Sequence, residues 1–197
     1  MTKKLRLFFL GLLFCFGIVS VMAQQDRTFS WTLGLQYDKT GELVSFTAPV
    51  KSSTGERFII VINPTVNCHC YIVVESMNGN DAGILYSGPL KGGEIWHSIK
   101  IELMPPQGTE SFFIVLSRTE QKNLVQRIQE FNNNSGSMQK RALMNEIFSI
   151  RNEVSRFKEA PEKPMLIGGV DRGNPEKSRG LEFSGLETYV KTISIEH

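Results

Sequence analysis

The chain has 197 residues, of which 41% are hydrophobic, 21% charged and 10% aromatic. These proportions are typical of a globular domain and exclude a disordered or collagen-like chain. There are 22 lysines and arginines against 20 aspartates and glutamates, so charge gives no reason to expect nucleic acid as a partner. Three cysteines are too few for a disulfide-rich scaffold.

The N-terminal residues have the pattern of a secretory signal peptide. Three basic side chains at 3–6 precede an apolar run at 7–21, which is shorter than the roughly 20 residues that a membrane-spanning helix needs. Val21 and Ala23 provide small side chains at the −3 and −1 positions of a cleavage site, and polar Gln24 follows. We therefore expect residues 1–23 to be removed and a single domain at 24–197 to remain, with an uncleaved anchor as the alternative.

Cleavage would leave 19 basic and 20 acidic side chains. Charge would then attract the mature domain neither to anionic lipid nor to nucleic acid, and no second apolar run is long enough to span a membrane. The expected location is the periplasm, the outer membrane or the medium.

Short apolar stretches with turn residues between them follow one another from residue 29 to 117. The stretch 29–37 alternates apolar and polar side chains, which predicts a strand with one buried face. We also expect strands at 42–48, 58–62, 68–75, 84–90, 95–103, 111–117, 165–167 and 188–195. Residues 174–180 are polar, and we expect them to be exposed. The pattern favours a mainly β fold, an antiparallel β-sandwich of immunoglobulin-like general architecture.

The hydrophobic period changes after residue 118, and we expect a helical hairpin within 119–158, inserted before the last strands. The second helix carries apolar side chains alternately four and three residues apart, which places them on one face. This apolar stripe comprises Leu143, Ile147, Ile150, Val154 and Phe157. Charged residues such as Lys140 and Arg141 lie off the stripe. We expect the stripe to pack on the chain's own sandwich.

Cys68-His69-Cys70 is the first candidate for chemistry. On a strand, the two thiols share one face and the imidazole lies on the other. Such thiols are poorly placed for a disulfide, and a zinc site needs further ligands at another spacing. We interpret the cysteines as small buried core residues; a redox-active thiol and a metal site are the alternatives.

Trp96 and His97 lie on opposite faces of the expected strand 95–103. His97 shares the apolar face, so we interpret it as a core or rim histidine. The alternative is a hydrolase with a rim site around His97 and Asp171, for which the chain has no nucleophile-elbow, His-Glu-x-x-His or P-loop motif. Trp96 lies on the polar face and is therefore a candidate binding contact.

The segment 168–173 is rich in glycine, which favours a tight turn. Its spacing differs from that of a dinucleotide-binding loop. The functional alternative is a binding loop in which Asp171 and Arg172 take part, with Arg172 contacting a carboxylate or phosphate.

Several segments in order resemble a bacterial family known only as domain of unknown function 4384. The resemblance covers roughly 29–197, and its most specific part is Gly108-Thr109-Glu110 before the strand that ends at Ser117. The other matching segments are Cys70–Glu75, Ile84–Leu90, Gly92-Gly93, Ile99–Leu103, Pro105-Pro106, Pro164–Arg172 and Tyr189–Ile193. The family implies an exported or envelope-associated β-rich module, sometimes found beside caspase-like peptidase domains. It implies no catalytic residues.

No convergent catalytic set is recognisable in the sequence. We therefore expect a non-catalytic interaction module of the cell envelope, without a cofactor or metal, whose partner is a protein or a glycan.

Overall fold

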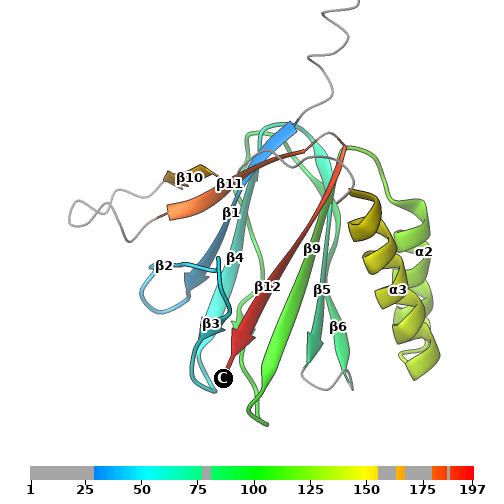
Figure 1. Cartoon of the computed structure of the whole chain (residues 1–197), viewed down its shortest axis with the longest axis horizontal. Coiled ribbons are helices and arrows are strands. Elements are labelled where there is room, and N and C mark those ends of the chain that lie inside the picture. Colours follow the sequence, from blue (N-terminus) through cyan, green and yellow to red (C-terminus); the bar gives the residue numbers. More distant parts are fainter. Residues whose placement is uncertain (1–28, 77–80, 155–162, 167–178, 186) are drawn as a thin grey trace, which may run out of the picture.

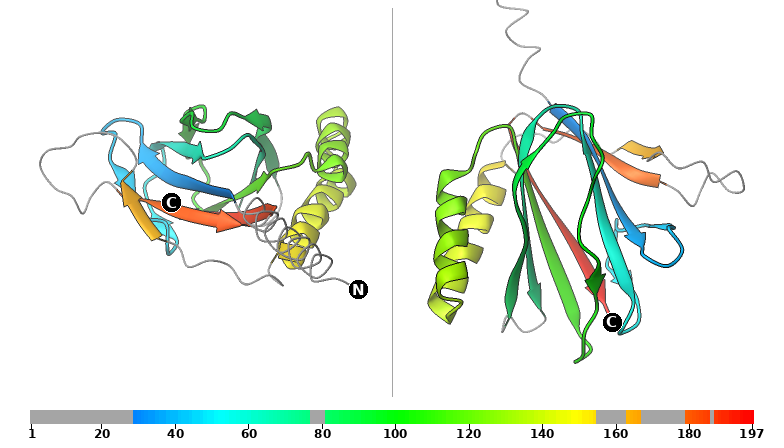
Figure 2. Two further views of the ribbon diagram at one scale, coloured as in Figure 1. Left: turned by 90° about the horizontal axis from the view of Figure 1, so that it is seen from above. Right: turned by 180° about the vertical axis from the view of Figure 1, so that it is seen from behind.

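The computed structural model describes residues 29–76, 81–154, 163–166, 179–185 and 187–197. Two β-sheets face each other, and two helices cover the outer face of one of them (Figures 1 and 2). The predicted mainly β sandwich and the helical pair before the last strands are thereby confirmed. Within these residues, neither helix is both long and apolar enough to cross a membrane.

Sheet A is built around two long neighbouring strands, β1 (Phe29–Tyr37) and β4 (Arg57–Pro64). Its other strands are β2 (Leu43–Val44), β7 (Trp96–His97), β8 (Ile101–Glu102), β10 (Lys163–Leu166) and β11 (Arg179–Gly185). β11 pairs with β1 and carries β10 on its other side, whereas β7 and β8 pair with β4. β1 therefore lies inside the sheet.

Sheet B contains five strands. In spatial order they are β3 (Val50–Lys51), β12 (Thr188–Glu196), β9 (Thr109–Ser117), β5 (Cys68–Ser76) and β6 (Ala82–Leu90). All neighbours are antiparallel except β3 and β12, which are parallel. β12, the last strand of the chain, thus has a neighbour on both sides.

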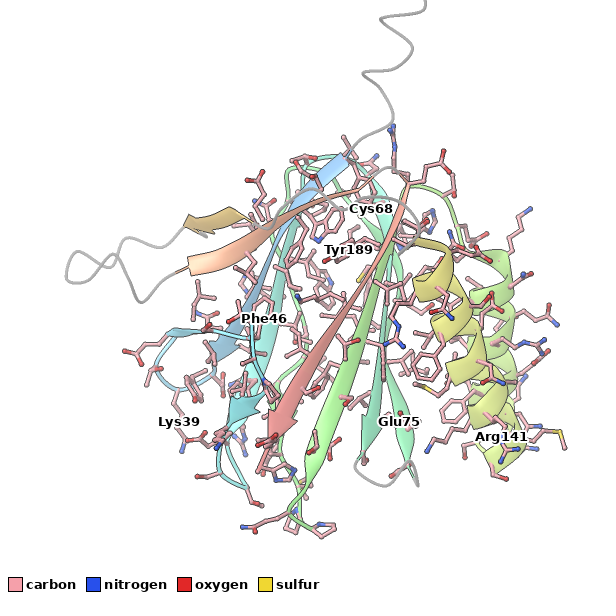
Figure 3. All side chains as sticks on the ribbon, in the orientation of Figure 1. Lys39, Phe46, Cys68, Glu75, Arg141 and Tyr189 are labelled. Atoms are coloured by element: carbon pink, nitrogen blue, oxygen red, sulfur yellow. The ribbon has the colours of Figure 1, made fainter. Side chains whose placement is uncertain are left out.

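The core lies between the sheets and follows from the alternation of side chains along the strands. On β1, Phe29, Trp31, Leu33 and Leu35 point inward, and none is more than 2% exposed. The neighbouring strand β4 adds Phe58, Ile60 and Ile62, and the strands of the opposing sheet B add Ile72, Phe112, Ile114, Leu116, Ile193 and Ile195. Figure 3 shows side chains filling the space between the two sheets. Each fully buried one contributes about 1.5–3 kcal/mol relative to exposure.

The helices α2 (Lys122–Asn133) and α3 (Ser137–Val154) form the predicted hairpin on the outer face of sheet B. Leu143, Ile147 and Ile150 are buried there and Val154 is half-buried, while Phe157 lies outside the described residues. Their partners on the sheet are Tyr71, Val73, Phe113, Val115 and Val190. The apolar stripe therefore packs on the chain's own sandwich, as predicted.

Polar contacts fix both ends of the hairpin on sheet B. Lys140 is only 9% exposed, and its Nζ lies 3.6 Å from Oε1 of Glu75 on β5. At the other end, the backbone N–H of Gln121 donates to the Tyr71 hydroxyl at 3.0 Å, and its side-chain amide donates to Ser117 at 2.8 Å. Lys140 therefore lies off the apolar stripe but is buried against the sheet, whereas Arg141 is exposed.

The predicted strand at 95–103 is wrong in its middle, where residues 98–100 are not in a strand. Trp96 packs on the core and His97 is exposed, the reverse of the expected faces. Ile101 and Leu103 then point inward. The side-chain alternation has therefore slipped by one residue between β7 and β8.

Ser98 accounts for this slip. Its hydroxyl accepts a hydrogen bond from the backbone N–H of Ile60 at 2.9 Å and donates to the carbonyl of Ile99 at 2.7 Å. The Ser98 hydroxyl thus accepts a hydrogen bond that a backbone carbonyl would accept in a regular strand beside β4. The ladder of backbone hydrogen bonds is therefore interrupted.

Three further expectations need correction. The strand expected at 42–48 is reduced to β2, at Leu43–Val44. A strand at Arg179–Gly185, β11, was not predicted, and it takes in the end of the segment 174–180 that was expected to be exposed and polar. The strand expected at 165–167 begins earlier, at Lys163. The predicted signal peptide lies outside the described residues.

Candidate functional site

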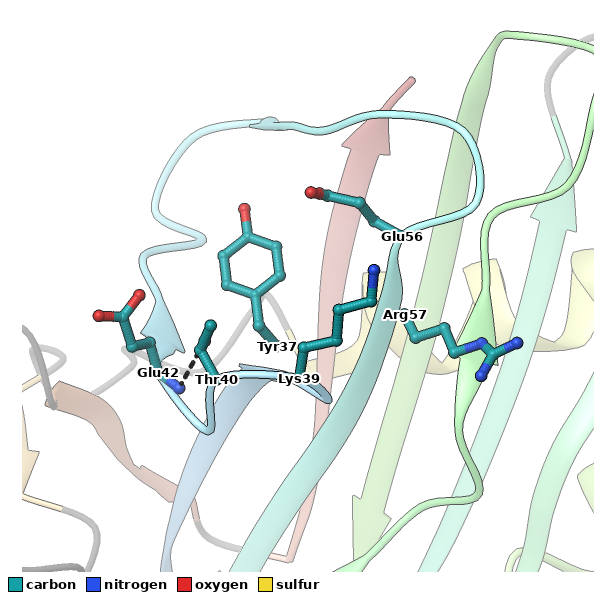
Figure 4. Close-up of a pocket in the computed structure, with 6 residues that line it drawn as sticks. All are labelled: Tyr37, Lys39, Thr40, Glu42, Glu56 and Arg57. Atoms are coloured by element: carbon teal, nitrogen blue, oxygen red, sulfur yellow. Dashed lines mark hydrogen bonds between the residues drawn. The ribbon is translucent and has the colours of Figure 1, made fainter.

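A pocket of about 190 Å³ opens beside the turn between β1 and β2 (Figure 4). Its lining residues are Tyr37, Lys39, Thr40, Glu42, Glu56 and Arg57. Tyr37 is the last residue of β1, and residues 39–42 lie in or after the turn. Glu56 comes directly before β4, and Arg57 is its first residue. The pocket therefore lies at one end of the two central strands of sheet A.

The turn that carries the pocket is stabilised by its own sequence. Gly41 has φ +71°, a left-handed conformation that other side chains rarely adopt. Its N–H donates to the carbonyl of Tyr37 at 2.9 Å, and the N–H of Tyr37 donates to the carbonyl of Glu42 at 2.9 Å. The Gln36 side chain donates to the Gly41 carbonyl at 2.6 Å. Together these bonds hold residues 38–41 against the end of β1.

Two ion pairs connect this region to β8 and the residue before it. Arg57 Nε lies 2.8 Å from Glu102 Oε2, and Lys100 Nζ lies 3.1 Å from Asp38 Oδ1. Figure 4 shows the Arg57 side chain directed away from Tyr37. The Arg57 guanidinium is therefore paired with the Glu102 carboxylate and not directed into the pocket.

Tyr37 is influenced by both carboxylates of the pocket. Burial, the charge of Glu56 and then that of Glu42 raise the pKa of Tyr37 above its usual value, so the phenol keeps its proton at neutral pH and can donate. Its ring packs on Phe58 with 4.8 Å between centroids, which orients the hydroxyl. The Ser52 hydroxyl donates to the Glu56 carboxylate and positions it.

The lining mixes hydrogen-bond donors and acceptors. Tyr37, Lys39 and Thr40 can donate, while Glu42 and Glu56 accept. Because pockets for drug-sized ligands measure about 300–1,000 Å³, this one is suited to a single small polar group. A group with several hydroxyls matches the lining, since each hydroxyl both donates and accepts. No family model, curated protein or solved structure matches the chain.

Cys68 and Cys70 are free thiols buried in the sandwich core, as predicted. Burial raises the pKa of Cys68 to about 11, and burial together with the neighbouring Cys68 raises that of Cys70. Because the thiolate is the reactive form, both groups are unreactive at neutral pH. Among the described residues, no three His, Cys, Asp or Glu side chains are grouped so as to hold a metal ion.

Replacing Cys68 and Cys70 together by alanine should leave the protein folded and cost about 1–3 kcal/mol. Because folding raises both pKa values, the stability from the protonated thiols is present below about pH 9 and is lost as the pH rises toward about 11. Urea denaturation across this range should therefore give a steeper loss of stability for the wild type than for the double variant. Stoichiometric zinc bound by the wild type and lost in the double variant would contradict the core interpretation.

Trp96 is half-buried, and its ring packs against Tyr86 of β6 with 4.6 Å between centroids. It therefore joins the edges of the two sheets. The argument that placed it on a polar face for binding was wrong. His97 is exposed, and no hydroxyl, thiol or carboxyl group of the described residues bonds to it. Asp171, Arg172 and the whole segment 168–173 lie outside the described residues.

The outer edge of sheet B, β6, is shielded against pairing with another strand. The Ala82 N–H donates to the Asp81 carboxylate at 2.9 Å, and a bulge leaves Leu85 without a partner on β5. The Tyr86 hydroxyl donates to the carbonyl of Pro89 at 2.8 Å, and proline itself has no N–H. Natural edge strands use such features to prevent strand addition, so β6 is not our candidate for ligand binding.

Sequence reasoning missed the pocket residues, although it recognised part of the turn that carries them. It expects turn residues between the strands at 29–37 and 42–48 but assigns no role to the side chains of Tyr37, Glu42 or Glu56. The sequence feature that could have indicated the pocket is the run of charged and hydroxyl residues between two strands. An ordinary exposed turn has the same composition, so the feature does not distinguish the two.

Proposed function

We propose that the chain is an exported, non-catalytic interaction module of the bacterial cell envelope whose partner is a glycan. The basic and apolar N-terminal residues support export, and the resemblance to domain of unknown function 4384 supports an envelope location. The observation that carries the proposal is the lining of the pocket. Donors at Tyr37 and Lys39 face acceptors at Glu42 and Glu56 in a space suited to one sugar-sized group.

The alternatives have less support. A hydrolase around His97 and Asp171 would need a nucleophile bonded to His97, whose imidazole has no such partner among the described residues. A redox or metal role for Cys68-His69-Cys70 is opposed by the raised pKa values of the two thiols. The binding experiment described below distinguishes a protein partner from a glycan.

The glycan proposal is tested by calorimetric titration of residues 24–197 with oligosaccharides released from bacterial envelopes. Glu56→Gln should weaken binding by at least about tenfold, because it removes a charged acceptor, a change of about 1.4 kcal/mol. Tyr37→Phe should also weaken it while keeping the ring contact with Phe58. Glu94→Gln is the matched control, because Glu94 is exposed and pairs with Lys91 outside the pocket.

Two results would contradict the proposal. Binding that is unchanged in Glu56→Gln and Tyr37→Phe would show that the glycan binds elsewhere on the protein. Capture of a protein, with no affinity for any glycan, would show that the partner is a protein. Release of new reducing ends, abolished by Glu42→Gln or Glu56→Gln, would show that the pocket is catalytic.

Export has its own test. The protein isolated from its native host should begin at Gln24 and should be found outside the cytoplasm. N-terminal sequencing and cell fractionation measure both properties. An intact Met1 in a membrane fraction would show that the N-terminal residues are an anchor.

A further inference from the structure

Outside the pocket lining, a hydroxyl, an imidazole and a carboxylate lie next to one another in space. Thr54 is exposed in the loop between β3 and β4, and its Oγ1 lies 3.2 Å from Nδ1 of His197, the residue after β12. The His197 side chain is 0% exposed, and its Nε2 lies 3.9 Å from Oε1 of Glu110 on β9. The imidazole is therefore buried between an exposed hydroxyl and a carboxylate whose side chain is 20% exposed.

The backbone holds these three residues in place. His197 and Gly108 exchange two hydrogen bonds, of 2.9 and 2.8 Å. Two backbone hydrogen bonds fix the loop of Thr54. The N–H of Ser52 donates to the backbone carbonyl of Glu196 at 2.8 Å, and the N–H of Gly55 donates to that of Leu103 at 2.7 Å. The contact between Thr54 and His197 therefore joins two anchored segments.

The tautomer of His197 decides the direction of proton transfer. When Thr54 donates to Nδ1, the neutral imidazole carries its own proton on Nε2, which faces Glu110. This buried Nε2 has no hydrogen-bond partner among the described residues. A positive charge on the ring would therefore be stabilised by the Glu110 carboxylate. Burial raises the pKa of Glu110 above its usual value, and His197 offsets only part of that rise. An exposed hydroxyl, its base and a carboxylate behind the base are the parts of an activated nucleophile.

We propose that Thr54 is a nucleophilic hydroxyl that accepts acyl groups from activated esters, with His197 as its general base and Glu110 stabilising the imidazolium. The Oγ1 lone pair forms a bond to the ester carbonyl carbon while the Oγ1 proton passes to Nδ1. The bond from that carbon to the leaving oxygen breaks, and the leaving group departs with the electron pair. The products are a threonyl ester on the protein and a free alcohol or phenol, which takes up the proton.

Burial of the base limits the reaction to one step. The His197 side chain is 0% exposed, and the acyl group on Thr54 would occupy the place from which water would have to reach it, so hydrolysis of the threonyl ester should be slow. We expect one acyl group per molecule and no turnover with activated esters. This reactivity is independent of glycan binding at the pocket and goes beyond the proposed function.

The test uses p-nitrophenyl acetate with residues 24–197, following p-nitrophenolate release and locating the acetyl group by peptide mass spectrometry. The wild type should carry it on Thr54. Thr54→Ala should lose the label, Thr54→Ser should keep it, and His197→Asn should slow labelling at least about tenfold, because general-base catalysis contributes about 10²–10⁴-fold. Thr119→Ala, which removes an exposed hydroxyl outside both sites, is the matched control. Melting curves establish that each variant is folded.

Three outcomes would overturn the proposal. The folded wild type could show no acetyl group on Thr54. Labelling of Thr54 could proceed at the same rate in folded His197→Asn. Release could persist in Thr54→Ala and disappear in His97→Ala, which would assign the reaction to the exposed imidazole.

Discussion

Substitution of Ile150 by aspartate should lower the free energy of unfolding by about 4 kcal/mol or more. Ile150 is buried between α3 and the outer face of sheet B. Loss of a large buried apolar side chain alone costs about 2–5 kcal/mol, and the carboxylate would be buried in an apolar cluster without a partner. Thermal and urea denaturation measure the effect.

Met138→Asp is the matched control, because Met138 stands on the same helix and is 76% exposed. Its effect should stay within about 0.5 kcal/mol. If Ile150→Asp left the melting temperature unchanged but abolished dimerisation or partner capture, the apolar stripe would face another molecule. Size-exclusion chromatography separates that outcome from unfolding.

Gly92 and Gly93 should both resist replacement by alanine, for different reasons. A Cβ on Gly92 would lie 2.5 Å from the backbone of Val66, so the β4–β5 turn would have to move. Gly93 has open space around it but has φ +77°. We expect Gly92→Ala to cost about 3 kcal/mol through overpacking and Gly93→Ala about 1–2 kcal/mol through backbone strain. Urea denaturation distinguishes the two values.

Asparagine separates the two causes, because it tolerates the left-handed conformation better than alanine does. Gly93→Asn should recover part of the stability lost in Gly93→Ala. Gly92→Asn should be at least as damaging as Gly92→Ala. Equal effects at the two positions, or recovery at Gly92, would contradict the close approach to Val66.

The strands with the clearest patterns were predictable because the pattern reports burial directly. β1 alternates along its full length, and β5 is a continuous apolar run between two packed layers. The segment 95–103 also alternates, but the hydrogen bonds of Ser98 interrupt it, and periodicity carries no information about such bonds. β11 contains two glycines and few apolar residues, so its pairing with β1 dominates its local preference.

The candidate sites were less predictable, because each depends on a long-range contact. Glu56 reaches Tyr37 only through the pairing of β1 with β4. Thr54 and His197 are 143 positions apart in the sequence. The sequence offered His197 only as one of three histidines, and nothing local distinguished it from His97. Long-range pairing decides which imidazole meets a hydroxyl and a carboxylate.

The interior positions of β1 and β12 have a consequence for the order of folding. β1 lies between β4 and β11, and β12 lies between β3 and β9. Both sheets therefore remain incomplete until the last part of the chain has been synthesised, and closing such long loops slows folding. A nascent chain would stay open during synthesis, which is the state that threading through a translocation channel requires. Delayed closure is therefore compatible with the export proposed above.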